Sequence, residues 1–268
     1  MLRKAGKTAY NIAKAYCPIS LLDTLGKLLS TLVAADISYL AEKHLLLFLT
    51  QFGSHPGRCT TNVMHLVTQQ IKDAWRSKKT ASILFLNIQV AFPNTVKERL
   101  IHNMKTRRVP TRYIKLIDHM LSNRSTRLKF DDFISEPIDI NNGTTQGCPF
   151  SMLLYAFYNA DLIDITNGKN ELSTGSINDC AFVAIGDTLE EMHQTLQNMM
   201  ERPSGGLEWA HSHNSTFELS KLAVMDFPHP NTNAPTTPLI IITPHANSTS
   251  ITSSIACVQE YKYLGVIF

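Results

Sequence analysis

The sequence contains no uncharged apolar run of 18 residues, the length that a membrane-spanning helix needs. Its beginning, MLRKAGKTAYNIAKAYCPISLL, has basic residues but no continuous apolar stretch of the signal-peptide type. The five cysteines are odd in number and include no CxxC pair, which argues against a disulfide framework or a zinc ribbon. A Walker-type phosphate loop and internal repeats are also missing. These absences favour an intracellular protein in a reducing compartment and disfavour secretion and membrane spanning.

Basic residues are scarce in the second half of the chain. Residues 1–130 hold 21 Lys and Arg against 6 Asp and Glu, whereas residues 131–268 hold 4 against 16. The net charge of only +3 therefore hides a basic front and an acidic back. A basic front favours binding of a polyanion, and an acidic back can carry carboxylate chemistry. For any single cluster of charges, a solvated helix face is the alternative.

Helices dominate the expected front of the chain, and strands follow. Apolar residues recur every three or four positions over 25–48, and Thr60-Thr61 followed by residues 62–79 indicates a second, capped helix. The run ASILFLNIQV (81–90) has the length and composition of a buried strand. Further helices are expected at 95–109, 111–123, 149–165 and 188–202, a hairpin at 125–140 and a strand in LIIIT (239–243). This order predicts an α+β fold with helices packed on one face of a small antiparallel sheet.

The stretch TGSINDCAFVAIGD (174–187) predicts a second tight hairpin. Two short apolar runs flank the polar pair Asn178-Asp179, which we expect in the turn. Such a turn would direct both polar side chains toward a substrate.

Six sequence blocks follow one another in a fixed order. They are AYCPISLLDTLGKLL (15–29), FLNIQVAFPNT (85–95), NNGTTQGCPFSMLLYAFYNADL (141–162), INDCAFVA (177–184), FELSKLAVMDF (217–227) and YKYLGVIF (261–268). Together they resemble the reverse transcriptase domain of non-LTR (LINE-type) retrotransposons, most closely the fungal kind. The likeness covers nearly the whole chain.

The resemblance implies a right-hand polymerase fold. Residues 1–80 would form a fingers-like region, and residues 81–268 a palm with a small antiparallel sheet and a fingers-associated insertion near 96–138. A thumb, an endonuclease and a ribonuclease H would be absent. The implied partners are an RNA template, a DNA primer and deoxynucleotides, without a membrane or an inferable obligate protein partner. The implied location is nuclear.

The resemblance also implies a metal site, at which this sequence departs from the family. In such enzymes a palm strand supplies one Asp and a hairpin supplies an Asp-Asp pair, which hold two Mg²⁺ (or Mn²⁺) ions about 4 Å apart. These positions fall on Asn87, Asn178 and Asp179. An amide oxygen brings no net charge, so three negative charges become one. We expect Asp179 to remain a metal ligand, with Asn87 and Asn178 as degenerate ligands.

Four nucleotide-binding positions of the family are retained. Phe92 matches the bulky residue below the incoming sugar, Gln146-Gly147 match the turn that supports the template–nucleotide pair, and Lys221 matches a lysine near the triphosphate. Each has a structural alternative. Phe92 can be a core aromatic, Gly147 can lead into a helix, and Lys221 can be a solvated lysine.

Further departures leave three functions open. Cys17 replaces an arginine that can contact phosphate, and Ser54-His55 replace a Gly-Arg or similar pair. The favoured hypothesis is a retrotransposon-derived reverse transcriptase domain that is catalytically inactive. The alternatives are a working reverse transcriptase and a non-catalytic module that binds RNA or DNA.

Two stretches mimic functional motifs. FDDF (130–133) resembles a polymerase signature but precedes the QG block, so we interpret it as a polar hairpin turn. HSH (211–213) has no further ligand at a suitable spacing and is expected in a surface loop.

Overall fold

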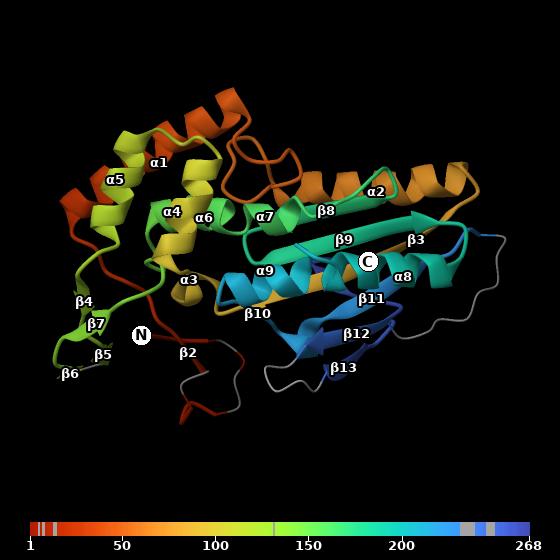
Figure 1. Cartoon of the computed structure of the whole chain (residues 1–268). Coiled ribbons are helices and arrows are strands. Elements are labelled where there is room, and N and C mark those ends of the chain that lie inside the picture. Colours follow the sequence, from red (N-terminus) through yellow and green to blue (C-terminus); the bar gives the residue numbers. More distant parts are fainter. Residues whose placement is uncertain (5, 7–8, 13–14, 131, 231–238, 245–249) are drawn as a thin grey trace. The chain divides into compact units, whose positions relative to one another are not determined.

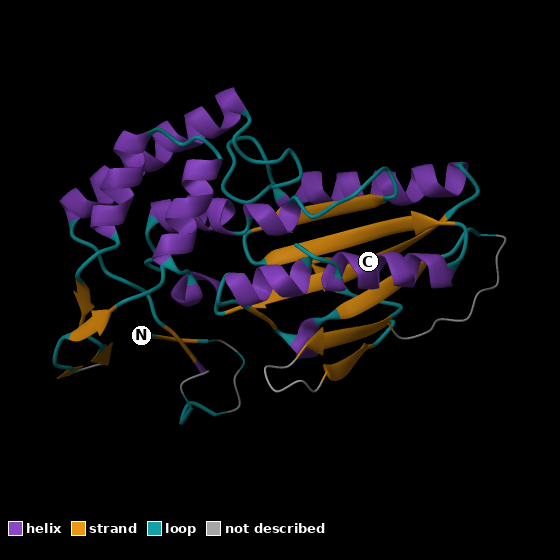
Figure 2. Ribbon diagram, in the orientation of Figure 1, coloured by secondary structure: helices purple, strands orange, loops and turns teal. Residues whose placement is uncertain are grey.

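The computed structural model describes residues 1–268 except 5, 7–8, 13–14, 131, 231–238 and 245–249. The chain forms two compact units, Met1–Leu46 with Phe92–Tyr158, and Leu47–Ala91 with Asn159–Phe268. Figure 2 distinguishes the helices, strands and loops of the described residues. The assignment of parts of the chain to fingers and palm stays a prediction.

The first unit is mainly helical (Figure 1). Its longer helices are α1 (Thr24–His44), α4 (Lys97–Thr106), α5 (Thr111–Met120) and α6 (Pro149–Tyr158). Its paired strands are β1 (Leu2–Arg3) with β2 (Tyr16–Cys17), β4 (Arg124–Thr126) with β7 (Ile138–Ile140), and β5 (Lys129–Phe130) with β6 (Phe133–Ile134). The short helix α3 (Ala91–Asn94) stands where the chain passes between the units.

The hairpin expected around FDDF is present in the first unit. Phe130 pairs with Phe133 across the β5–β6 turn, while Asp131 lies outside the described residues. The four helices expected at 25–48, 95–109, 111–123 and 149–165 are also present, but the last is interrupted. It ends at Tyr158, and a separate short helix begins at Ala160.

The second unit is built on an antiparallel sheet. On one edge, β3 (Thr80–Gln89) pairs with β9 (Asp179–Gly186), and β9 pairs in turn with β8 (Glu171–Ser176). Two short strands, β10 (Thr216–Phe217) and β11 (Ala223–Phe227), pair with successive parts of the other edge of β3. The remaining strands are β12 (Leu239–Pro244), β13 (Ser250–Ile255), β14 (Lys262–Tyr263) and β15 (Val266–Ile267). The helices are α2 (Thr60–Arg76), α7 (Ala160–Ile163), α8 (Leu189–Glu201), α9 (Gly206–Ser212) and the 3₁₀ turn η2 (Leu219–Lys221).

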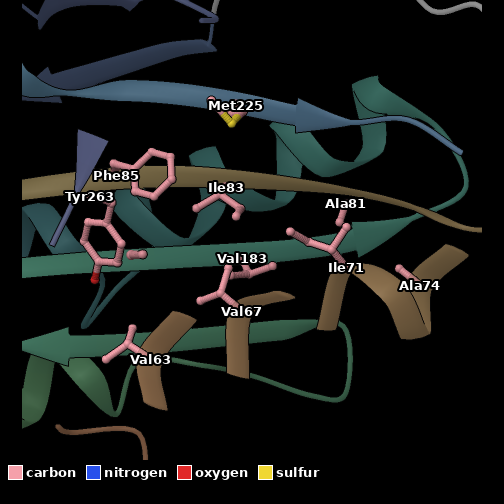
Figure 3. Close-up of a cluster of buried hydrophobic side chains, with 11 residues drawn as sticks. Val63, Val67, Ile71, Ala74, Ala81, Ile83, Phe85, Val183, Met225 and Tyr263 are labelled. Carbon is pink, nitrogen blue, oxygen red and sulfur yellow. The ribbon is translucent and has the colours of Figure 1, made fainter. Parts of the chain in front are cut away.

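Helices cover both faces of this sheet, not one face as expected (Figure 1). Alternate residues of a strand point to opposite faces. Ile83 and Phe85 of β3 pack with Val67 of α2 in the core cluster that Figure 3 shows. On the other face, the Thr80 hydroxyl lies 3.4 Å from the sulfur of Met192 on α8. The uninterrupted apolar run of β3 requires this two-sided cover, because nearly all of its residues are buried.

The HSH stretch is not a surface loop. His211 lies in the last turn of α9, and His213, 2% exposed, stacks on Trp209 with ring centroids 4.8 Å apart. The ring nitrogen Nδ1 of His213 lies 2.9 Å from the Trp209 carbonyl oxygen. Gly205 is the N-cap of α9. Among the described residues, no helix is long and apolar enough to span a bilayer.

Candidate functional site

The hairpin β8–β9 presents two of the expected site residues at its tip. β8 ends at Ser176 and β9 begins at Asp179, so the turn consists of Ile177 and Asn178. The expected turn pair Asn178-Asp179 is therefore shifted by one residue. Asp179 belongs to the strand because it pairs with Ser176 on one side and with Asn87 on the other.

Asn87 and Asp179 are joined across neighbouring strands. The amide Nδ2 of Asn87 donates a hydrogen bond of 2.7 Å to Oδ1 of Asp179. The Ile88 amide donates to the carbonyl oxygen of Asn178 at 2.9 Å, which secures the turn to β3. Asn87 itself is 9% exposed. The structure thus brings Asn87 together with Asn178 and Asp179, which follow it about 90 positions later in the sequence.

Lys221 reaches the same place from η2. Its Nζ lies 3.5 Å from Oδ1 of Asn87 and 2.7 Å from a carboxylate oxygen of Glu218. The Glu218 backbone amide donates to the Asn87 carbonyl oxygen at 2.9 Å, which fixes the start of η2 against β3. The side chain of Lys221 is 54% exposed, so its pair with Glu218 is a surface ion pair of small energy. A chain of polar contacts therefore runs from Asp179 through Asn87 to Lys221 and Glu218.

Two tyrosines near the end of the chain border this polar chain. The Tyr261 hydroxyl donates to the Lys221 carbonyl oxygen at 2.8 Å, and its ring stacks on Phe85 at 4.4 Å. Burial and, next, the negative charge of Asp179 raise the pKa of Tyr261 above its ordinary value. Burial likewise raises the pKa of Tyr263, and Asp179 adds to the effect. Both phenols are therefore neutral at physiological pH.

The side chains at this site do not fit a pair of divalent cations. Within the described residues, no group of three or more His, Cys, Asp or Glu side chains is placed to hold a metal ion. Asp179 is the one carboxylate among the three expected ligands. Asn87 turns its donor nitrogen toward that carboxylate, and its oxygen faces the Lys221 ammonium. Mg²⁺ prefers charged oxygen ligands, which this arrangement supplies only once.

The other expected nucleotide-binding residues lie in the first unit. Phe92 is half-buried, and its ring centroid lies 5.5 Å from that of Tyr155. The carbonyl oxygen of Gln146 accepts a hydrogen bond of 2.9 Å from the Ser20 amide. Gly147 has a φ of +101°, a conformation that favours glycine. The family roles of these three residues stay predictions.

Two buried amides beside the hairpin, Gln51 and Asn159, were not predicted from the sequence. Asn159 donates to the carbonyl oxygen of Ile177 at 2.6 Å and accepts from Gln51 at 2.8 Å. The available signal was a lone amide inside the long apolar stretch PFSMLLYAFYNADL. Such a residue interrupts a helix when it has a partner elsewhere in the fold.

A central strand and an adjacent hairpin thus bring polar residues together at one end of an antiparallel sheet. The chain belongs to the reverse transcriptase family, since the family model "Reverse transcriptase (RNA-dependent DNA polymerase)" matches residues 2–268. This match confirms the class of protein that the six blocks predict.

Relatives of known description are mobile-element polymerases of Drosophila. The chain is 28% identical over 248 residues to a probable RNA-directed DNA polymerase from transposon X-element of Drosophila melanogaster, covering 87% of this chain and 27% of that protein. It is 27% identical over 273 residues to the RNA-directed DNA polymerase from mobile element jockey of Drosophila funebris, covering 100% of this chain and 28% of that protein. The chain therefore spans little more than a quarter of these relatives. The expected likeness to the fungal kind receives no support from them.

Solved structures share the fold at low sequence identity. A telomerase from Candida tropicalis in complex with a fragment of telomeric RNA matches with a TM-score of 0.56 and 9% identity, covering 82% of this chain and 36% of that chain. The apo form matches with a TM-score of 0.53 and 9% identity, covering 79% and 38%. Telomerase has a right-hand polymerase fold, so the mixed helix and sheet architecture agrees with the expected fold class.

Proposed function

We propose that this chain is a reverse transcriptase domain of a non-LTR retrotransposon that has lost catalytic activity. The observation that carries the proposal is the hydrogen bond from Asn87 to Asp179. The amide satisfies the remaining carboxylate internally, at the place where the family would bind cations. Nucleotidyl transfer needs charge neutralisation by two metal ions, and one carboxylate is insufficient to assemble them.

The roles of the other residues follow from the family. Lys221 would lie near the triphosphate, Phe92 below the incoming sugar, and Gln146-Gly147 against the template–nucleotide pair. The partners would be an RNA template, a DNA primer and deoxynucleotides, and the location nuclear. Any remaining activity would depend on Mg²⁺ or Mn²⁺, for which Asp179 would be the charged ligand.

A primer-extension assay tests the loss of activity. We expect no extension of an RNA-templated primer by the natural sequence and measurable extension by the Asn87→Asp, Asn178→Asp double variant. Asp179→Asn in the double variant is the matched control and removes extension again. Extension by the natural sequence would establish a working reverse transcriptase and contradict the proposal.

Binding without catalysis is a second candidate function, favoured by the charge of residues 1–130. Lys and Arg residues in RSKK (76–79), KTRR (105–108) and RSTRLK (124–129) are the candidates for contacts with a nucleic-acid backbone. Arg124 is not one of these candidates, because it is half-buried and its guanidinium donates to the Gly143 carbonyl oxygen at 2.7 Å. RNA affinity that falls steeply with rising salt, without extension, would support this function. Affinity that is unchanged between low and physiological salt would exclude it.

A further inference from the structure

The tip of the β8–β9 hairpin holds a residue in an unfavourable backbone conformation. Ile177 has a φ of +61°, a region in which a β-branched side chain is a genuine outlier. A conformation of this kind persists only where surrounding contacts determine it. The next two residues along the chain are Asn178 and Asp179. Whatever holds Ile177 therefore also sets the position of the site residues.

Asn159 supplies one contact that holds the tip. This residue is fully buried, and its Nδ2 donates to the Ile177 carbonyl oxygen at 2.6 Å. Because a carbonyl oxygen can only accept, the nitrogen of the amide must face Ile177. The Asn159 oxygen then faces the other way, where it accepts a hydrogen bond of 2.8 Å from Nε2 of Gln51. The orientation of the two amides is thus fixed by the backbone at one end.

Gln51 is itself anchored by backbone contacts. It is 1% exposed and forms a parallel bridge with Gly175 of β8. The Phe52 amide donates to the Gly175 carbonyl oxygen at 2.7 Å, and the Gly175 amide donates to the Thr50 carbonyl oxygen at 3.1 Å. Arg58 donates to the Gln51 carbonyl oxygen at 2.9 Å.

Two glycines leave the space that these amides require. A Cβ on Gly175 would lie 2.6 Å from Cδ1 of Ile163 and would also meet the side-chain oxygen of Gln51. A Cβ on Gly53 would lie 2.7 Å from the Ile177 backbone nitrogen. Both distances are too short for real Cβ contacts, so the chain packs closely around the tip.

We propose that Gln51 and Asn159 are positioning residues that fix the hairpin tip and thereby place Asn178 and Asp179 beside Asn87. The relevance of that placement to metal binding rests on the proposed function. The claim that the two amides fix the hairpin tip does not rest on it. This claim depends only on contacts of the hairpin, since the Asn178 carbonyl oxygen, one residue beyond Ile177, accepts from the Ile88 amide at 2.9 Å. Release of the Ile177 carbonyl would loosen this bond between the tip and β3.

Amide hydrogen exchange of the whole chain tests whether Gln51 and Asn159 fix the hairpin tip. Asn159→Leu nearly keeps the shape of the side chain but has no group that can donate to the Ile177 carbonyl oxygen. We expect exchange of the Ile88 amide to become about tenfold faster, since opening of the tip exposes it. The Val258 amide, which donates to the Val224 carbonyl oxygen at 2.8 Å, should be unaffected.

Two further variants keep this test decisive. Gln51→Met removes only the outer hydrogen bond, so it should fold even if Asn159→Leu does not, and it should accelerate Ile88 exchange to a smaller extent. Ser151→Ala is the control, because the buried Ser151 hydroxyl donates to the Thr145 carbonyl oxygen at 2.7 Å and both residues belong to the first unit. The proposal would be overturned if Ile88 exchange were the same in the natural chain, Gln51→Met and Asn159→Leu, or if it rose equally in Ser151→Ala.

Binding of Mn²⁺ separates this proposal from the proposed function. In the Asn87→Asp, Asn178→Asp background, adding Asn159→Leu should weaken Mn²⁺ affinity about tenfold, since misplaced ligands bind less well, while adding Ser151→Ala should not. Equal affinity in all three proteins would show that the two amides do not position the site. If the double variant itself binds no Mn²⁺, the proposed metal site fails, and Ile88 exchange alone decides the role of the amides.

Discussion

The side-chain nitrogen of Asn87 lies 2.7 Å from Oδ1 of Asp179, and the two residues are direct partners across β3 and β9. Replacement of that nitrogen by a second carboxylate oxygen would turn a hydrogen bond into a repulsion between like charges. Asn in place of the family's Asp at position 87 therefore has two opposite effects. It stabilises the metal-free protein, and it weakens the expected metal site.

We expect Asn87→Asp to lower the free energy of unfolding by about 2 kcal/mol without metal, because it replaces a hydrogen bond to a charged group with an unfavourable carboxylate pair. Urea unfolding at neutral pH with a chelator measures this loss. Asn142→Asp is the control, since Asn142 is exposed and its variant should unfold like the natural chain. An Asn87→Asp protein as stable as the control would mean that the two side chains do not meet.

The buried carboxylate of Asp226 should make a second contribution to stability, which depends on pH. Its side chain is 1% exposed and accepts hydrogen bonds from Ser82 at 2.5 Å and Cys257 at 3.2 Å, with Nε2 of His193 at 2.9 Å. Burial acts to raise the pKa of Asp226, but these partners outweigh it, so that the pKa lies below its ordinary value of 3.8. A lowered folded-state pKa stabilises the protein above the unfolded value, and the stabilisation is lost as the pH falls through the folded-state pKa.

Asp226→Asn should therefore lower the free energy of unfolding at pH 7 by about 2 kcal/mol, the typical value of hydrogen bonds to a charged group. The natural chain should lose stability as the pH falls from 5 toward the acid transition, because Asp226 becomes protonated below about pH 4. The Asp226→Asn variant lacks this carboxyl group and should lose less stability over the same range. Urea unfolding over this pH range is the measurement. The exposed Asp187 provides the control variant Asp187→Asn, and identical pH profiles for both variants would contradict the assignment.

Cysteine reactivity should differ sharply between positions. Hydrogen bonds with the Asn62 backbone and the Thr61 side chain lower the pKa of the exposed Cys59. Burial and the contact with Asp226 raise the pKa of Cys257 to about 12, and burial raises the pKa of Cys180 further. Since the thiolate is the nucleophile, iodoacetamide at pH 8 should modify Cys59 before the other two. Peptide mass spectrometry over time measures the order, and faster modification of Cys257 would contradict it.

The sequence predicts those elements whose residues carry their own pattern. The apolar run of β3 and the helical spacing of α2 and α8 are visible without any partner, and all three elements form within a few residues of the expected bounds. The position of the hairpin turn is different. Asn178-Asp179 is the more turn-like pair, but pairing of Asp179 with Asn87 moves the turn to Ile177-Asn178. Cross-strand register is a long-range property that local propensity does not contain.

Long-range partners also explain the features of the site that were missed. The helix expected over 149–165 stops because Asn159 bonds to the carbonyl oxygen of Ile177, 18 residues later. The contact of Gln51 with Asn159 joins positions 108 residues apart. By contrast, the closeness of Asn87 and Asp179 follows from the ordered blocks, since a family resemblance carries tertiary information that periodicity lacks.

The most direct test of the central claim compares metal-induced stabilisation of two proteins, the natural chain and its double variant. Ligands that bind the folded state raise its melting temperature. The natural chain and the Asn87→Asp, Asn178→Asp variant would each be melted with a chelator and with millimolar Mg²⁺ or Mn²⁺. We predict that the variant has the lower Tm without metal but gains clearly more from either cation, because its site again holds three carboxylates. Equal shifts in Tm for the two proteins would contradict the claim that Asn87, Asn178 and Asp179 form a metal site that has lost its charge.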